Sequence, residues 1–176
     1  MIEPAPPYAN EGPHALWHVS EEPTIRRFEP RGVEEALVWA IDTRHLPLYW
    51  FSRDCPRATY WARECTSDED VERFLEGDRS RRVHVIESAW LARMREATVY
   101  AYRMPEETFE PWDRFWISRA AVEPLELVEL GDLLELHAGA RIELRIAPEL
   151  LAFWDKVVNS TLDFSGIRLR NATLTS

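Results

Sequence analysis

A histidine and a hydroxyl lie two residues apart on the expected β-strand 16–20. Side chains alternate between the two faces of a strand, so His18 and Ser20 share one face. Trp17 and Val19 then point to the opposite face. An imidazole beside a hydroxyl can bind ribose hydroxyls or phosphate oxygens. A histidine that is satisfied in the core, or that lies on one exposed sheet face, is the simpler alternative.

A second polar group is the turn 53–57, which follows an aromatic run and carries two arginines. Pro56 stiffens its backbone. The guanidinium groups of Arg53 and Arg57 suit bidentate binding of phosphate, with Asp54 orienting one of them. A set of structural salt bridges that fixes the loop explains the same residues equally well.

Several well-known site motifs are absent from the sequence. It contains no glycine-rich phosphate-binding loop and no Gly-x-Ser-x-Gly nucleophile elbow. The five histidines and two cysteines show no zinc-ligand spacing, so no metal is expected. No pair of carboxylates can be singled out as an acid–base couple.

The charge of the chain argues against an extended nucleic-acid surface. The formal net charge is -10, which opposes the neutralisation of many phosphates. All but Lys156 of the 21 basic residues are nevertheless arginine. An acidic protein with a local arginine pocket would select a small anion, such as a nucleotide, over a polymer.

The 176 residues are expected to form one domain over residues 15–176, after a loose proline-rich leader over residues 1–14. No basic segment followed by an apolar run marks a signal peptide, and no apolar stretch approaches the length of a membrane span. These features predict a cytoplasmic protein without a membrane partner.

Strand and helix signals alternate irregularly along the chain, which favours an α+β fold. Strands are expected at 16–20, 37–41, 83–86, 98–104, 124–130 and 141–146, with less marked patterns at 58–62 and 115–118. Ser67 and Asp70 form a capping-box pattern before an apolar-periodic run that ends at Gly77. Further helices are expected after Ser88, after Asp132 and from Pro148 onward.

Residues 16 to about 172 resemble a family of small bacterial proteins known as a domain of unknown function. The resemblance rests on segments spread over the chain, namely 16–21, 28–31, 38–42, 53–57, 85–90, 143–145, 160–162 and 168–171. It implies no activity.

The order of elements is more distantly similar to the ADP-ribosyltransferase fold, a split antiparallel or mixed β-sheet that holds NAD in a central cleft. The first strand of that fold supplies a histidine to the adenosine ribose, which His18 matches, and a helical turn at 25–28 would follow. The family's catalytic glutamate would fall near 115–118, but no glutamate stands there, and the nearest acids are Asp113 and Glu123. A branch of the same fold removes 2′-phosphates from RNA with an Arg-His-Arg pocket.

Together these features predict a pocket for NAD or a related phosphorylated nucleotide. His18 and Ser20 would bind ribose hydroxyls. The phosphate ligands would be Arg31, Arg53 and Arg57, and the base would stack on Trp39 or Tyr60. Any reaction would be ribosyl transfer or 2′-phosphate transfer, with no catalytic residue identified.

A non-enzymatic interaction module without a nucleotide pocket is the alternative. Its partner is not indicated, although exposed tryptophans such as Trp50 or Trp61 would mark the surface. A nucleotide site would instead show a pocket in which His18 meets at least two arginines.

Overall fold

The computed structural model describes residues 15–32 and 34–173 and has the α+β fold that the sequence predicted. The strands are β1 Leu16–Ser20, β2 Val38–Asp42, β3 Arg57–Trp61, β4 Arg82–Glu87, β5 Tyr100–Met104, β6 Glu110–Trp112, β7 Phe115–Ser118, β8 Glu126–Glu129, β9 Ile142–Ala147 and β10 Asp163–Ile167. The helices are α1 Asp68–Leu75, α2 Leu91–Glu96, α3 Leu133–Gly139 and α4 Leu151–Val158. Three short 3-10 helices are η1 Leu46–Tyr49, η2 Ser88–Trp90 and η3 Leu169–Asn171.

The described chain forms two compact units, each built from two stretches of sequence. Unit 1 takes in the described residues up to Trp50 together with Thr98–Gly131, and unit 2 takes in Phe51–Ala97 and the described residues from Asp132 onward. The expected leader over residues 1–14 lies outside the described residues, and the single domain over 15–176 stays a prediction. In the described part of the chain, no helix is both long and apolar enough to cross a bilayer.

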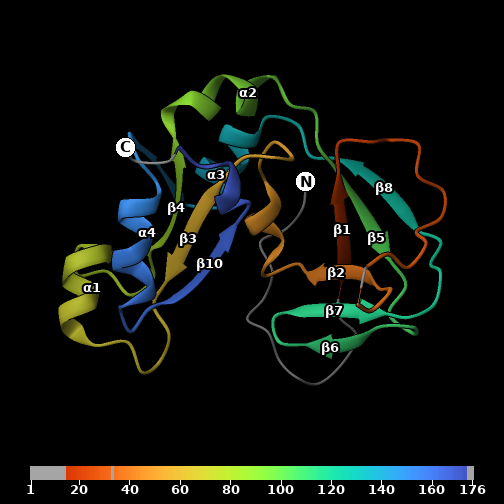
Figure 1. Ribbon diagram of the computed structural model, residues 1–176, viewed down its shortest axis with the longest axis horizontal. Coiled ribbons are helices and arrows are strands. Elements are labelled where there is room, and N and C mark those ends of the chain that lie inside the picture. Colours follow the sequence, from red (N-terminus) through yellow and green to blue (C-terminus); the bar gives the residue numbers. More distant parts are fainter. Residues whose placement is uncertain (1–14, 33, 174–176) are drawn as a thin grey trace. The chain divides into compact units, whose positions relative to one another are not determined.

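Unit 1 is an antiparallel sheet of six strands in the order β6-β7-β2-β1-β5-β8 (Figure 1). Its core lies against the face that carries even-numbered residues of the central strands, because alternate side chains of a strand share a face. The buried residues of this core are Leu16, Phe28, Val38, Ala40, Tyr102, Met104, Phe109 and Val122.

The central strand β1 is paired unequally with its two neighbours. It pairs with β5 over its whole length, from Leu16↔Met104 to Ser20↔Tyr100. Its pairs with β2 are Leu16↔Asp42 and Trp17↔Ile41. The second half of β1 therefore lies beyond the ladder that joins it to β2.

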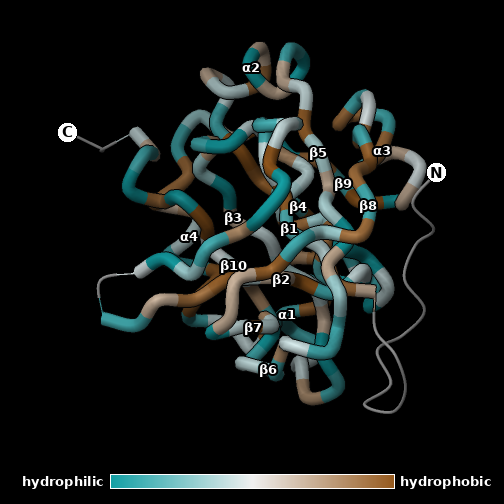
Figure 2. Tube along the Cα trace, turned by 90° about the vertical axis from the view of Figure 1, so that its right-hand side faces the viewer, coloured by the Kyte–Doolittle hydropathy of each residue, from teal (hydrophilic) through white to brown (hydrophobic). Residues whose placement is uncertain are grey.

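Unit 2 contains a four-stranded sheet in the order β10-β3-β4-β9, in which β4 and β9 are parallel and the other pairs are antiparallel. Tyr60 and Val83 point to the face on which α1 and α4 pack (Figure 1). The opposite face carries Thr59 and His84, which pair across β3 and β4 and are both fully buried. The hydropathy-coloured tube shows apolar segments along the strands and polar segments in many connections (Figure 2).

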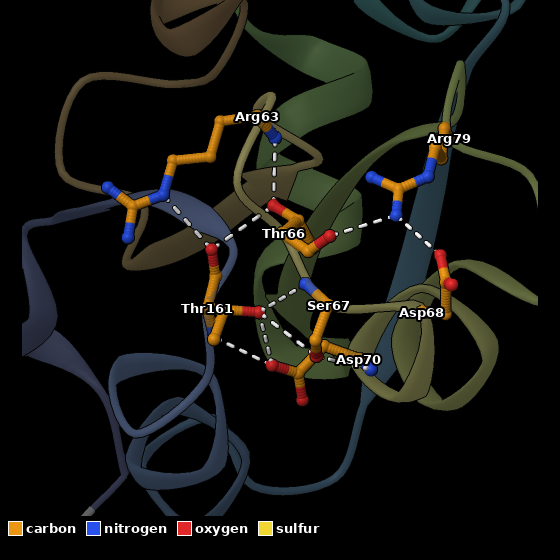
Figure 3. A network of polar contacts seen from close by, with 7 residues as sticks. All are labelled: Arg63, Thr66, Ser67, Asp68, Asp70, Arg79 and Thr161. Atoms are coloured by element: carbon orange, nitrogen blue, oxygen red, sulfur yellow. Dashed lines mark hydrogen bonds and ion pairs between the residues drawn. The ribbon is translucent and has the colours of Figure 1, made fainter.

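A polar network joins the segment before β10 to the start of α1 (Figure 3). Ser67 Oγ accepts the N–H of Asp70, which is the helix cap that the sequence predicted. In a capping box the side chain of Asp70 would accept a hydrogen bond from the N–H of Ser67. Here that N–H donates instead to Thr161 Oγ1 at 2.9 Å. The Thr161 hydroxyl in turn donates to Asp70 Oδ2 at 2.6 Å. Thr161 therefore closes the cap from outside the helix.

Three expectations about local structure are wrong. Residues 25–28 form no helical turn, since the N–H of Phe28 donates to Val122 in an isolated bridge. The last helix, α4, begins at Leu151 rather than at Pro148. Two strands, β6 and β10, form where none was expected.

Candidate ligand pocket

The imidazole of His18 is held at the point where the β1–β2 ladder ends. Its Nδ1 lies 2.8 Å from the carbonyl oxygen of Trp39. A carbonyl can only accept, so Nδ1 carries the proton and Nε2 of the neutral ring keeps its lone pair. The ring also packs on Phe28, with centroids 4.6 Å apart. Burial lowers the pKa of His18, and the bond to Trp39 only partly opposes this effect. The neutral imidazole therefore presents a fixed hydrogen-bond acceptor.

A hollow of about 60 Å³ lies entirely within unit 1, and His18 is among the residues that line it. Strand β1 supplies Trp17, His18 and Val19, and strand β2 supplies Trp39, Ala40 and Ile41. The remaining lining residues are Tyr49, from η1, and Phe115, from β7. Four aromatic side chains and one imidazole make this a site for a flat or apolar ring.

Two aromatic walls of the hollow are held by further contacts. The indole N–H of Trp17 donates to Thr43 Oγ1 at 2.8 Å. Trp39 packs edge-on against Phe115, with ring centroids 5.8 Å apart, and remains 41 % exposed. Trp39 is therefore positioned by the sheet while one side of it is open to a ligand.

The turn after β2 brings Tyr49 to the hollow. Asp42 Oδ1 accepts hydrogen bonds from the backbone N–H of His45 at 2.8 Å and from its imidazole at 2.9 Å. Burial raises the pKa of Asp42, but the bonds and charge of His45 outweigh burial, so the pKa of this carboxyl is lowered overall. The carboxylate fixes the turn from which η1 begins, with Pro47 in its first turn.

Ser20 and Arg31 belong to unit 1 but do not line the hollow. Ser20 Oγ accepts the N–H of Glu22 at 3.1 Å, which makes it part of a local turn. Arg31 is exposed, and its backbone exchanges two hydrogen bonds with Leu37. The structure therefore brings His18 together with Trp39, and it brings no arginine into this hollow.

The other predicted site residues, Arg53, Arg57 and Tyr60, lie in unit 2. Arg53 is exposed. Arg57 is buried, with its guanidinium over the ring of Phe51 and a 2.9 Å hydrogen bond to the carbonyl of Cys55.

Tyr60 is fully buried beneath the helices of unit 2. Its hydroxyl accepts a hydrogen bond of 2.9 Å from Arg145, and burial raises its pKa to about 12. Arg57 and Tyr60 therefore have structural partners inside unit 2.

The acids that flank β7 are engaged at the surface. Asp113 lies 3.6 Å from Arg114, and Glu123 lies 3.5 Å from Arg27. Neither acid lines the hollow. Within residues 15–32 and 34–173, no group of three or more histidine, cysteine or acidic side chains is arranged to hold a metal ion.

Three aromatic residues that line the hollow were not predicted as site residues from the sequence, namely Trp17, Tyr49 and Phe115. The alternation along β1 places Trp17 and His18 on opposite faces, yet both residues are among those that line the hollow. The sequence does contain a signal for Tyr49, because Pro47 is typical of a helix start and lies just before the aromatic residues 49–51. The partner-surface alternative named Trp50 as exposed, which is wrong because Trp50 is only 5 % exposed.

A protein-family model, described as "Family of unknown function (DUF6886)", matches residues 17–172. No curated protein and no solved structure matches the chain. The family match agrees with the resemblance over residues 16 to about 172, whereas no comparison supports similarity to ADP-ribosyltransferases. Because this match covers most of its length, the chain belongs to the family of unknown function DUF6886.

Proposed function

We propose that unit 1 binds NAD or a related phosphorylated nucleotide, with its ribose in the hollow that His18 helps to line. The observation that carries the proposal is the hydrogen bond from His18 Nδ1 to the carbonyl of Trp39, because both residues line the aromatic hollow. It fixes Nε2 as an acceptor, and a ribose hydroxyl is a donor that suits it.

The size and lining of the hollow favour one ring over a whole dinucleotide. At roughly 10–15 Å³ for each water-sized group, about 60 Å³ holds about four to six such groups, which is about the size of a single five- or six-membered ring. The rest of a nucleotide would lie outside, where the exposed face of Trp39 can stack on a base. Such stacking contributes about 1–3 kcal/mol to binding.

The phosphate ligands of this proposal differ from those expected from the sequence. Arg31 is an exposed cation of unit 1 and is kept as a phosphate ligand. Arg57 donates to the carbonyl of Cys55 and stacks on Phe51, which supports a structural role for it. Binding is proposed without a transfer step, because neither an arginine nor a carboxylate lines the hollow.

An interaction module remains the second candidate, favoured by apolar side chains at the two edges of the unit 1 sheet. Trp112 on edge strand β6 is 49 % exposed. Leu125 and Leu127, beside and within edge strand β8, are 68 % and 43 % exposed. Edge strands with exposed apolar side chains can pair with another chain.

The test is a thermal-shift and calorimetric titration of the full chain with NAD, ADP-ribose, NADP and a 2′-phosphorylated nucleotide. A ligand at about 100 times its Kd adds about 2.7 kcal/mol of stability, which gives a clear rise in Tm. Trp39→Ala should weaken binding about tenfold or more, and Trp112→Ala is the matched control because it removes an exposed tryptophan outside the hollow.

His18→Phe keeps an aromatic ring against Phe28 but removes the acceptor nitrogen, so it should also weaken binding. No rise in Tm with any ligand at millimolar concentration would contradict the proposal. Equal losses in the two tryptophan variants would contradict it as well, because binding would then not depend on the hollow. The absence of any rise in Tm would favour the interaction module.

A further inference from the structure

Unit 2 contains a buried pair of histidines that the proposed nucleotide site does not use. His84 on β4 is fully buried, and His137 on α3 is 1 % exposed. His84 Nδ1 lies 3.0 Å from His137 Nε2. The ring of Phe51 packs on both imidazoles, with centroids 5.5 Å and 5.1 Å away. This hydrogen bond joins the helix to the sheet through two side chains that can each take up a proton.

The hydrogen bond between His137 and the backbone of Leu133 determines which nitrogen of each ring carries a proton. His137 Nδ1 lies 2.7 Å from the carbonyl of Leu133, so this nitrogen must donate. His137 Nε2 of the neutral ring then accepts, and His84 Nδ1 donates to it. His84 Nε2 is left with a lone pair, and it has no hydrogen-bond partner among the described residues. That nitrogen can take up a proton without breaking the bond between the two rings.

The charges that act on this nitrogen are positive. Arg82, on the same strand, and Arg57, on β3, both lower the pKa of His84, after burial as the largest cause. Burial also lowers the pKa of His137 to about 4, with a smaller contribution from Arg82. A proton on His84 would thus be a third buried cation beside two guanidinium groups.

The acids of the neighbouring elements do not offset that charge. On α3 itself, Asp132 and Glu135 are exposed, and on α2, which packs against α3, Glu96 is exposed beside Arg93 and Arg95. On β9, the residue opposite His84 is Leu144, whereas Glu143 and Arg145 bond to each other near Tyr60.

We propose that the His84–His137 hydrogen bond is an acid-released latch, which holds α3 on β4 at neutral pH and frees α3 when the pair takes up protons. A proton on His84 Nε2 creates a buried charge that Arg82 and Arg57 disfavour. A proton on His137 Nε2 removes the acceptor and breaks the bond between the helix and the strand. The buried charge and the lost hydrogen bond both destabilise the closed state of α3. Neither does so once α3 opens and water reaches the two rings.

The direction and size of the effect follow from linkage. A histidine whose pKa is depressed in the folded chain contributes full stability above about 6.5 and loses it as the pH falls toward the folded pKa. For His137 that window runs from 6.5 to about 4. At pH 5 the closed state of α3 should be about 30-fold less favoured than at pH 7.5 through His137 alone.

The experiment is hydrogen–deuterium exchange of the full chain at pH 7.5 and pH 5, with rates corrected for the pH dependence of intrinsic exchange. Amides of α3 should lose protection about 30-fold or more at pH 5, whereas those of the β1–β5 ladder should change little. Equal corrected protection of α3 at the two pH values would overturn the proposal.

A double variant, His84→Leu with His137→Leu, removes both titrating rings and should leave α3 equally protected at both pH values. His45→Gln, which removes a histidine of unit 1, is the control and should release α3 like the original chain. If acid release persists in the double variant, the latch is not this pair.

Should the double variant fail to fold, an imidazole ¹⁵N titration of the original chain gives the same decision. The two rings should stay neutral until α3 amides lose protection. Protonation near pH 6.5 with α3 still protected would refute the latch.

Discussion

The hydroxyl of Thr161 donates a 2.6 Å hydrogen bond to Asp70 Oδ2, although 91 residues separate the two in sequence (Figure 3). The backbone N–H of Thr161 donates to the same oxygen at 2.7 Å. These bonds lower the pKa of Asp70 below its usual value, with the side-chain bond as the largest cause. One threonine therefore both completes the cap of α1 and attaches the helix to the segment before β10.

Thr161→Val should destabilise the chain by about 1 kcal/mol, because the cap loses the bonds of the Thr161 hydroxyl to Ser67 and Asp70 while the side-chain shape is kept. Urea unfolding measures this loss. Thr98→Val is the control, since Thr98 is an exposed threonine outside the network and should change stability little.

The same substitution should also change the acid limb of the stability profile. An aspartate whose pKa is depressed in the folded chain contributes stability above about 3.8 and loses it as the pH falls through the folded pKa. The difference between the original chain and Thr161→Val should therefore shrink below about pH 4. A difference that grows in acid would show that Asp70 is not the partner that matters.

Gly166→Ala should destabilise unit 2 by about 1–3 kcal/mol through overpacking. A Cβ at Gly166 would lie 2.7 Å from Leu169 Cδ1 and 2.7 Å from the ring of Trp154, which is itself packed against Phe164. Gly139→Ala is the matched control at the end of α3, where a Cβ meets nothing within 4 Å. Thermal unfolding should show a lowered Tm for the first variant only.

The two cysteines should differ sharply in reactivity. Cys65 is exposed, whereas Cys55 is buried and burial raises its pKa to about 12. Since the thiolate is the reactive form, Ellman's reagent should modify one thiol quickly in the folded chain. Cys65→Ser should abolish the fast phase. A fast phase that survives this substitution would mean that Cys55 is accessible.

Ligand binding at His18 should be lost in acid. The pKa of His18 lies below 6.5, so the ring stays neutral at neutral pH and Nε2 can accept from a ribose hydroxyl. Protonation turns Nε2 into a donor, and the Kd should therefore rise as the pH falls through the folded pKa. Calorimetry between pH 7.5 and 5 measures this dependence. Tighter binding in acid would instead indicate that an imidazolium holds a phosphate.

Strands whose own residues form a typical strand pattern could be predicted from the sequence. Strands that form only because they pair with a distant segment could not. Strands β1 and β7 have the predicted bounds, because both are short segments rich in aromatic and β-branched residues. Strand β6 consists of three exposed residues with Pro111 at its centre, so it carries no strand pattern. Strand β10 contains Gly166 and acquires its order from pairing with β3.

The candidate site could be predicted only in part, for a related reason. Alternation along a strand gives the face of His18, but the place where one ladder stops depends on the register of two strands. The same register brings the carbonyl of Trp39 within hydrogen-bond distance of the His18 imidazole. Arg57 and Tyr60 sit on strand β3, and their sequence neighbours do not reveal that β3 belongs to another unit than β1.

The chain passes from one unit to the other after Trp50, after Ala97 and after Gly131, and this path governs the order in which a growing polypeptide can fold. While the ribosome is still adding β3, α1, β4 and α2, strand β1 lacks β5, its most extensive partner. The first sheet can close only after the middle of the message has been translated, and β9 and β10 reach the second sheet later still. No single cut in the gene separates the two units.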